Sequence, residues 1–121
     1  MKYETNLPIY LQVVDAIKLE VINGRIKPGE KLPSGRDLAV QYTINPNTSA
    51  RVYQELEAQG MCFTKRGMGT FVTEDYDRIT ACRNEMAQES LKKFLTSLYQ
   101  LGITKEDAIN MINEANDICL L

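Results

Sequence analysis

The sequence contains no histidine among its 121 residues. Without an imidazole, neither the Ser–His nor the Cys–His pair of a nucleophilic enzyme can form, and the commonest nitrogen ligand of zinc is missing. No Gly-x-x-x-x-Gly-Lys phosphate-binding loop is present, and the carboxylates are scattered over predicted helix ends and exposed faces. These absences predict that the protein is not an enzyme and holds no metal or cofactor.

Membrane-spanning and secretory segments are also missing. No apolar run is long enough to cross a bilayer, and the first six residues lack the apolar core of a secretion signal. The three cysteines, Cys62, Cys82 and Cys119, are an odd number without Cys-x-x-Cys spacing, so we expect reduced thiols with structural roles. The sequence therefore predicts a cytoplasmic protein that does not enter a membrane.

Charge is unevenly distributed along the chain. The net charge is −2, which by itself argues against nucleic acid as a partner. Residues 24–72, however, carry seven lysines and arginines against four acidic residues, whereas the residues from 76 onward carry five against seven. A basic front half joined to an acidic tail suits a protein that contacts phosphates with one end only.

Residues 45–60 predict one helix with both ends marked in the sequence. Asn45 is a capping residue, Pro46 fits the first helical position, and Gly60 fits the left-handed position that closes the helix. Its inward stripe, at i, i+3, i+4 and i+7, is Ser49, Val52, Tyr53 and Leu56. Its outward face near the start is Asn47, Thr48, Ala50, Arg51 and Gln54. Groups of this kind can read base edges and phosphates in a major groove, although a plain solvated face fits the same pattern.

Two further helices are predicted before this one. The first runs from Pro8 to Asn23, and its apolar stripe is Ile9, Val13, Ile17 and Val21, widened by Tyr10, Val14 and Ile22. After a short extended stretch at residues 31–33, Ser34 caps the second. The side chains that this second helix is expected to bury are Leu38 and either Val40 or Tyr42. Two helices joined by a few residues, the latter capped by asparagine, form the helix-turn-helix pattern.

After residues 45–60, the candidate recognition helix, the hydrophobic pattern changes to period two. Residues 61–64 and 70–72 predict a β-hairpin with a glycine-bearing turn. Lys65 and Arg66 lead into its tip, and Gly69 allows the backbone to approach an opposing surface closely. A hairpin directly after a recognition helix is the wing of a winged helix, and the basic tip favours a phosphate or minor-groove contact. A hairpin that only covers the core is the alternative.

An acidic hinge divides the predicted domains, residues 1–75 and residues 76–121. The second domain predicts a long helix from about Tyr76 to Leu101 and a shorter one capped at Thr104. The apolar seam of the long helix is Ala87, Leu91, Phe94, Leu98 and Leu101. The stripe of the shorter helix is Ala108, Ile109, Ile112, Ala115 and Ile118. Two such stripes are buried better against a second copy, which predicts a dimerisation hairpin; folding back onto the first domain is the alternative.

Four segments resemble the GntR family of bacterial transcription regulators: residues 32–39, 45–48, 53–57 and 67–72. The Asn-Pro-Asn-Thr run and the short tail are similar to its YtrA-like subfamily. The resemblance implies a winged helix-turn-helix repressor that dimerises through its C-terminal helices and binds an inverted repeat in double-stranded DNA. The resemblance implies DNA contacts at Ser34, Arg36, Asn47, Thr48, Arg51 and Gly69, with Lys65 and Arg66 supporting the wing. Asn45, which caps the helix, completes the DNA-binding candidates.

Three positions depart from the family's pattern. Ser49 replaces the apolar residue usually buried there, which predicts a slightly looser seat for the recognition helix. Ala50 stands where many relatives outside the subfamily carry a DNA-binding arginine, so Arg51 and Asn47 are expected to do more of the base reading. Met68 occupies a wing position that is often basic or polar.

The predicted fold is therefore mainly α with a small β-hairpin wing: a winged helix-turn-helix followed by a two-helix dimerisation hairpin. The family's larger tails bind metabolites, sometimes through metal-held histidines, and that metal chemistry is absent from this sequence. A small-molecule effector between the tail helices is left open, and the sequence names none. A winged helix used for protein–protein assembly, without DNA binding, is the alternative function.

Overall fold

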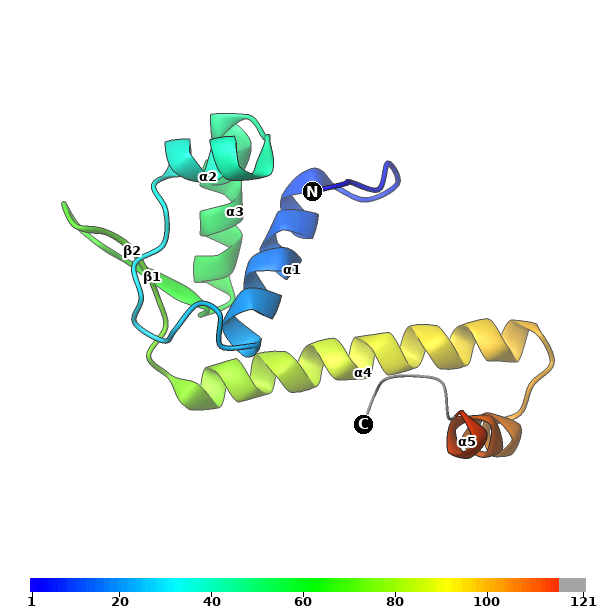
Figure 1. Ribbon diagram of the computed structural model, residues 1–121. Helices are drawn as coiled ribbons and strands as arrows, with labels where there is room; N and C mark the ends of the chain where they lie inside the picture. Colours follow the sequence, from blue (N-terminus) through cyan, green and yellow to red (C-terminus); the bar gives the residue numbers. More distant parts are fainter. Residues whose placement is uncertain (116–121) are drawn as a thin grey trace. The chain divides into compact units, whose positions relative to one another are not determined.

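The structure is a computed structural model that describes residues 1–115. Its elements, in chain order, are α1 (Ile9–Ile22), α2 (Gly35–Tyr42), α3 (Pro46–Ala58), β1 (Cys62–Lys65), β2 (Gly69–Val72), α4 (Tyr76–Gln100) and α5 (Lys105–Glu114) (Figure 1). The predicted fold class, mainly helical with one antiparallel two-stranded hairpin, is confirmed. Two of the predicted tail positions, Ile118 and Cys119, lie outside the described residues.

The chain forms two compact units, one up to Arg83 and one from Asn84 onward. The division falls inside α4, whereas the sequence places the domain boundary at the start of that helix. The first turns of α4 belong to the first unit, where Cys82 is fully buried and the Arg78 Nε–H donates to the Gln59 carbonyl oxygen at 2.6 Å.

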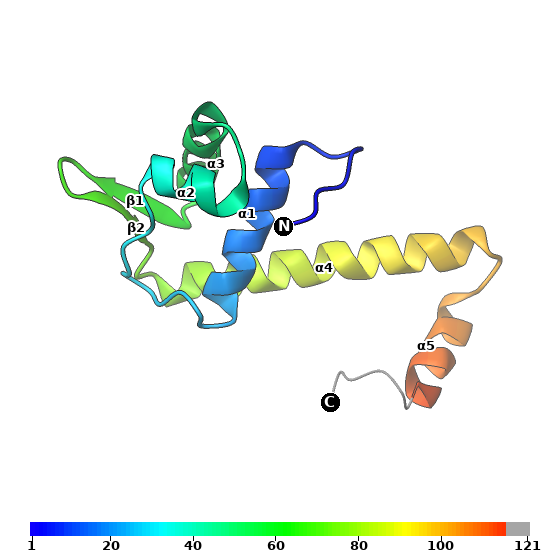
Figure 2. The same cartoon turned by 45° about the horizontal axis from the view of Figure 1, so that its top comes forward.

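The core of the first unit lies where α1 and α2 pack against α3 (Figures 1 and 2). The buried side chains of these three helices include Val13, Val14, Ile17, Val21, Leu38, Val52 and Leu56. One sequence prediction fails at the edge of this core: Ile9 is 45% exposed because it is the first residue of α1. Of the two alternatives predicted for α2, Tyr42 is half-buried, whereas Val40 is 77% exposed because the face of α2 that turns inward carries Leu38 and Ala39.

The wing is an antiparallel hairpin in which Cys62 pairs with Val72 and Lys65 pairs with Gly69. The extended segment before α2 runs along its second strand. The Leu32 N–H donates to the Thr70 carbonyl oxygen at 2.8 Å, and the Val72 N–H donates to the Glu30 carbonyl oxygen at 2.9 Å. Because these bonds join the wing to the segment that leads into α2, the base of the wing is tied to the helix-turn-helix.

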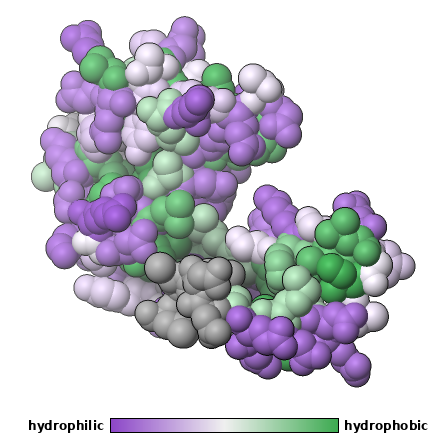
Figure 3. Space-filling model, turned by 45° about the vertical axis from the view of Figure 1, so that its right-hand side comes forward, coloured by the Kyte–Doolittle hydropathy of each residue, from purple (hydrophilic) through white to green (hydrophobic). Residues whose placement is uncertain are grey.

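In the second unit, Leu98 of α4 and Ala108 of α5 are both buried, and both line the pocket between the two helices. The Thr104 hydroxyl accepts the Asp107 N–H at 3.1 Å, which confirms the predicted cap. Much of the apolar surface stays uncovered within the single chain (Figure 3). Its exposed large side chains include Leu91, Phe94, Leu101, Ile109 and Ile112, so the predicted inward stripe of α5 is buried at Ala108 but not at the two isoleucines.

Within residues 1–115, no helix is both long enough and apolar enough to span a lipid bilayer. The same residues include no group of three or more cysteine or acidic side chains placed to hold a metal ion. Cys62 and Cys82 are buried, and burial raises the pKa of the Cys62 thiol to about 11, with a smaller contribution from the nearby Glu57 carboxylate. The structure thus places both of these cysteines in the core.

Candidate nucleic-acid interface

The start of α3 presents a polar face to solvent. The Asn45 Oδ1 atom accepts the Asn47 N–H at 2.8 Å, and Pro46 occupies the first helical position, so the predicted start of the helix is confirmed. The predicted outward side chains at Asn47, Ala50, Arg51 and Gln54 are exposed, and Thr48 is half-buried. The cap uses the oxygen of Asn45 and leaves its NH₂ group as the remaining donor of that side chain.

The opposite face of α3 is anchored in the core. Ser49, Val52 and Leu56 are buried, and the half-buried Tyr53 donates its hydroxyl to the Pro33 carbonyl oxygen, which ties α3 to the segment before α2. Burial raises the pKa of Tyr53 well above its ordinary value, with smaller contributions from neighbouring Cys62, Tyr42 and Asp37. The phenol therefore keeps its proton, and so its donor role, throughout the physiological pH range.

Ser49 is a weak point of this anchoring. Its side chain is 0% exposed, and its Oγ atom has no hydrogen-bond partner in the part of the chain that the structure describes. An unsatisfied buried hydroxyl costs about 1 to 3 kcal/mol of desolvation free energy. The cost lies directly beneath the recognition face, in line with the looser seat that the sequence predicts.

Arg51 is held by a residue that the sequence analysis did not single out. Its guanidinium carbon lies 3.9 Å from the centroid of the Tyr10 ring, a cation–π distance. In the described chain no carboxylate forms a salt bridge with Arg51. Tyr10 is part of the predicted apolar stripe of α1, but that pattern gives no sign of a contact across to α3.

The start of α2 and the wing meet at a shared hollow of about 760 Å³. Its lining includes Lys31, Ser34, Tyr53, Met68 and Gly69. The Ser34 Oγ atom accepts the Asp37 N–H at 3.1 Å, as the cap requires. The hollow thus brings together two DNA-binding candidates, Ser34 and Gly69. The other seven candidates lie outside its lining.

The basic residues of the wing differ in their surroundings. The Lys65 ammonium lies 4.8 Å from the centroid of the Phe71 ring and 5.7 Å from that of Phe63. These two rings stack with centroids 5.9 Å apart. Arg66 and Met68 are exposed at the tip. Lys65 is therefore supported by an aromatic pair at the side of the wing, while Arg66 is the basic side chain at the tip itself.

Gly69 lies close to the side chain of another residue of the same chain, Lys31. Its φ of +123° is a conformation that residues with a Cβ rarely adopt, and an added Cβ would stand 2.8 Å from the Cε atom of Lys31. The sequence predicts an approach to an opposing surface without naming that surface. The structure supplies Lys31, an exposed cation beside Ser34 that the sequence analysis missed.

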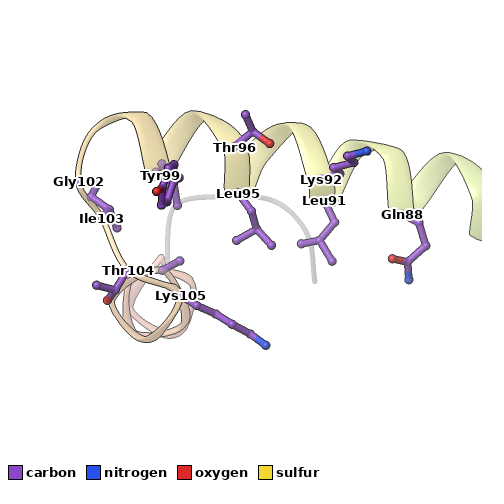
Figure 4. Close-up of a pocket in the computed structure, with 12 residues that line it drawn as sticks. Gln88, Leu91, Lys92, Leu95, Thr96, Tyr99, Gly102, Ile103, Thr104 and Lys105 are labelled. Atoms are coloured by element: carbon purple, nitrogen blue, oxygen red, sulfur yellow. The ribbon is translucent and has the colours of Figure 1, made fainter.

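The second unit contains a separate pocket of about 780 Å³ between α4 and α5. Leu91 and Leu95 point from α4 toward the side of α5, and Lys105 extends along the same side (Figure 4). The two charged side chains among its described lining residues are both cations, Lys92 and Lys105. The predicted seam is therefore divided: Leu91 and Leu98 line this pocket, whereas Ala87, Phe94 and Leu101 do not.

Comparison with known proteins places this architecture in a family. The family model described as "Bacterial regulatory proteins, gntR family" matches residues 9–72, which span α1 to β2. The uncharacterized HTH-type transcriptional regulator YhcF of Bacillus subtilis is 37% identical over 111 residues, covering 92% of this chain and 92% of YhcF. The HTH-type transcriptional repressor YtrA of the same organism is 35% identical over 111 residues, covering 91% of this chain and 85% of YtrA.

A solved structure matches most of the chain. The GntR family transcriptional regulator from Listeria monocytogenes matches with a TM-score of 0.86 and 36% identity, over 94% of this chain and 100% of that chain. The predicted resemblance is thus confirmed, and the relatives are regulators rather than enzymes. A helix-turn-helix with an exposed polar recognition face, followed by a wing, is the DNA-binding part of such regulators. This chain belongs to the GntR family of DNA-binding bacterial transcription regulators.

Proposed function

We propose that this protein is a transcriptional repressor that binds an inverted-repeat operator as a homodimer. The observation that carries the proposal is the exposed N-terminal half of α3, where Asn47 and Arg51 lie on the outward face and no carboxylate within residues 1–115 pairs with Arg51. The repressor role is supported by the similarity to YtrA, which is named as a repressor.

The residues of α3 would divide the base contacts by their chemistry. A guanidinium presents a fork of donors that matches the O6 and N7 atoms of guanine, and an amide matches the N6 and N7 atoms of adenine. We therefore assign guanine contacts to Arg51 and adenine contacts to Asn47. The Thr48 hydroxyl would contact either a base edge or a phosphate. Ala50 takes little space, which lets the helix enter the major groove closely.

The remaining candidates would position the protein on the backbone. Ser34 and Arg36 lie at the start of α2, where exposed donors can bind phosphates. Lys65 and Arg66 provide cations along the wing for phosphates or the minor groove. These contacts carry little sequence information but contribute most of the salt-dependent affinity. Asn45 acts mainly by fixing the start of α3.

Dimerisation would use the uncovered apolar surface of the second unit. Phe94 and Leu101 are 41% and 73% exposed and do not line the pocket between α4 and α5. Burying a large apolar side chain stabilises an association by about 1.5 to 3 kcal/mol. A two-fold pairing through α4 would present two copies of α3 to DNA with opposite orientation, which requires an inverted repeat.

Selection of bound sites from random DNA by the full-length protein tests the proposal. We expect an inverted repeat whose half-sites are separated by one turn of DNA, about 34 to 36 Å, or by a multiple of it. Affinity for the selected site should fall steeply as salt rises, because phosphate contacts release counterions. If the selection recovers no preferred sequence and binding is insensitive to salt, the proposed repressor function is contradicted. The alternative function, protein–protein assembly, would then be favoured.

The pocket between α4 and α5 is the site we propose for an effector. Its lining is mostly apolar, and Lys92 and Lys105 supply positive charge without a carboxylate among the lining residues that the structure describes. These features favour a small ligand with an apolar body and an anionic group. Because Leu91 and Leu98 belong to both the pocket and the seam, a bound ligand would alter the packing on which the dimer depends.

Straight-chain carboxylates of increasing length are suitable probes of this pocket. We expect the longer members to release the protein from its selected site, and Lys105→Gln to weaken that release. Lys93→Gln is the matched control, since Lys93 pairs with Glu89 at 3.9 Å and does not line the pocket. Equal responses of the two variants would contradict the assignment of the pocket.

A further inference from the structure

The contact between Tyr10 and Arg51 joins α1 to α3, two helices that lie side by side in the first unit (Figure 1). Tyr10 is the second residue of α1 and is half-buried, whereas Arg51 is exposed on the outward face of α3. With the guanidinium carbon 3.9 Å from the ring centroid, the cation lies over the ring. The side chain of Arg51 is thus held in place by a residue outside the helix-turn-helix.

A ring in this position leaves the hydrogen-bonding capacity of Arg51 intact. Guanidinium is planar, so stacking on an aromatic ring uses its face while its five N–H donors lie at the edge. No carboxylate in residues 1–115 forms a salt bridge with Arg51. The fork that would bind a guanine is therefore compatible with the observed contact between Arg51 and the Tyr10 ring.

We propose that Tyr10 is a positioning residue for base recognition: its ring holds the Arg51 guanidinium over the start of α3 before DNA arrives. A long, flexible side chain loses rotamer freedom when it binds, and holding it in advance reduces that loss. Tyr10 acts through Arg51 and makes no base contact itself. The inference rests on the proposed base-reading role of Arg51 and adds to it a second residue, on a helix that is not inserted into the groove.

The position of the ring also predicts how sequence preference depends on Tyr10. An arginine that is free to swing can reach phosphates as well as bases, whereas a stacked guanidinium is restricted to one region of the groove. Loss of the ring should therefore lower the ratio of specific to nonspecific affinity. A residue that only fills the core would not change this ratio.

A double-mutant cycle on the full-length protein tests the inference, with the selected operator and a scrambled sequence as the two DNAs. Tyr10→Leu removes the ring but keeps an apolar side chain, and we expect about two- to fivefold weaker operator binding, the size of an exposed cation–π contact. Tyr10→Phe keeps the ring and should bind as the wild type does. In the Arg51→Ala background, Tyr10→Leu should cause no further loss.

Thermal melting of each variant separates the inference from a folding defect. A similar loss from Tyr10→Leu in both backgrounds would show that Tyr10 acts through packing, and would overturn the inference. Stronger operator binding by Tyr10→Leu would show that the ring withholds Arg51 from DNA, which also overturns it. A wild-type protein without sequence preference, or an Arg51→Ala variant that keeps full specificity, would instead refute the proposed function of Arg51 itself.

Discussion

The Cε atom of Lys31 lies 2.8 Å from the position that a Cβ on Gly69 would occupy. Lys31 belongs to the segment before α2, and Gly69 begins the second strand of the wing. The lysine stem therefore crosses the wing where its backbone carries no side chain. Lys31 also lines the hollow shared by Ser34 and the wing, and the positive φ of Gly69 favours glycine whatever the space around it.

Gly69→Ala should lower the free energy of unfolding by about 1 to 3 kcal/mol, because a residue with a Cβ is strained at a φ of +123°. Urea unfolding measures the change. Gly67→Ala is the matched control: Gly67 also has a positive φ, of +77°, but a Cβ there would meet nothing within 4 Å. We expect a smaller loss for Gly67→Ala, because a φ of +77° is closer to the left-handed helical region that residues with a Cβ can adopt, and equal losses would contradict the strain assigned to Gly69.

Ser49→Ala should stabilise the protein by about 1 kcal/mol, because it removes a buried hydroxyl that lacks a hydrogen-bond partner among the described residues. Alanine also has the higher helix propensity, which adds a few tenths of a kcal/mol. Ser90→Ala, at an exposed position of α4, measures that propensity term alone. Unfolding curves in urea should show a larger gain for Ser49→Ala. A loss of stability would indicate that the hydroxyl is satisfied.

Arg51→Ala should weaken binding to the selected operator by about 1 to 3 kcal/mol and relax base preference, as expected for a forked contact with guanine. Fluorescence anisotropy with the operator and with single-base variants measures both effects. Gln54→Ala, one turn further along the same exposed face, is the control and should change affinity less. A uniform loss across all sequences would transfer the base-reading role to Asn47.

Lys65→Ala should behave differently, because a phosphate contact carries no sequence information. Specific and nonspecific affinity should fall about equally, and the slope of log affinity against log salt should decrease by about one unit. The Lys65 ammonium already lies 4.8 Å from the Phe71 ring centroid, so Lys65→Arg, which keeps a stacking cation, should retain most of the binding. A change in base preference in Lys65→Ala would contradict the phosphate assignment.

Helix starts are the part of this fold that the sequence predicts well, because capping is local. Ser34, Asn45 and Thr104 each accept an N–H from two or three residues further along the chain, so the signal and its effect lie in the same few residues. The inward stripe of α3 is equally predictable, since a helix of known start has a known buried face.

Contacts between distant segments are the part that the sequence does not predict. Tyr10 meets Arg51, Lys31 crosses Gly69, and the buried Lys18 donates to the Gln59 Oε1 atom at 2.8 Å. In each pair, one residue fits an ordinary helix or strand pattern. No sequence feature near that residue indicates which distant residue it will contact. The contributions of Lys31 and Tyr10 to the basic part of the candidate site can therefore be recognised only from the packing of the elements.

The packing of α4 changes where the protein should be cut to test dimerisation. A cut at the predicted hinge after Asp75 would remove Arg78, which donates to the Gln59 carbonyl oxygen, and Cys82, which is fully buried. A fragment ending at Arg83 keeps these core contacts. A single substitution on the intact chain is sharper still, because it leaves the first unit unaltered.

Phe94→Asp in the full-length protein should give a monomer that binds the operator poorly. Phe94 is 41% exposed on α4, away from the pocket, and a carboxylate there would oppose burial in a two-fold interface. Because a dimer makes the second half-site contact intramolecular, its loss should reduce apparent affinity by a factor on the order of 10² to 10⁴ without altering any base contact. Light scattering measures the oligomeric state, and footprinting shows whether both half-sites are protected. Gln100→Asp, at an exposed position of α4 that does not share the face of Phe94 and Leu101, is the control and should remain dimeric. A Phe94→Asp protein that still dimerises and protects both half-sites would rule out α4 as the dimerisation element.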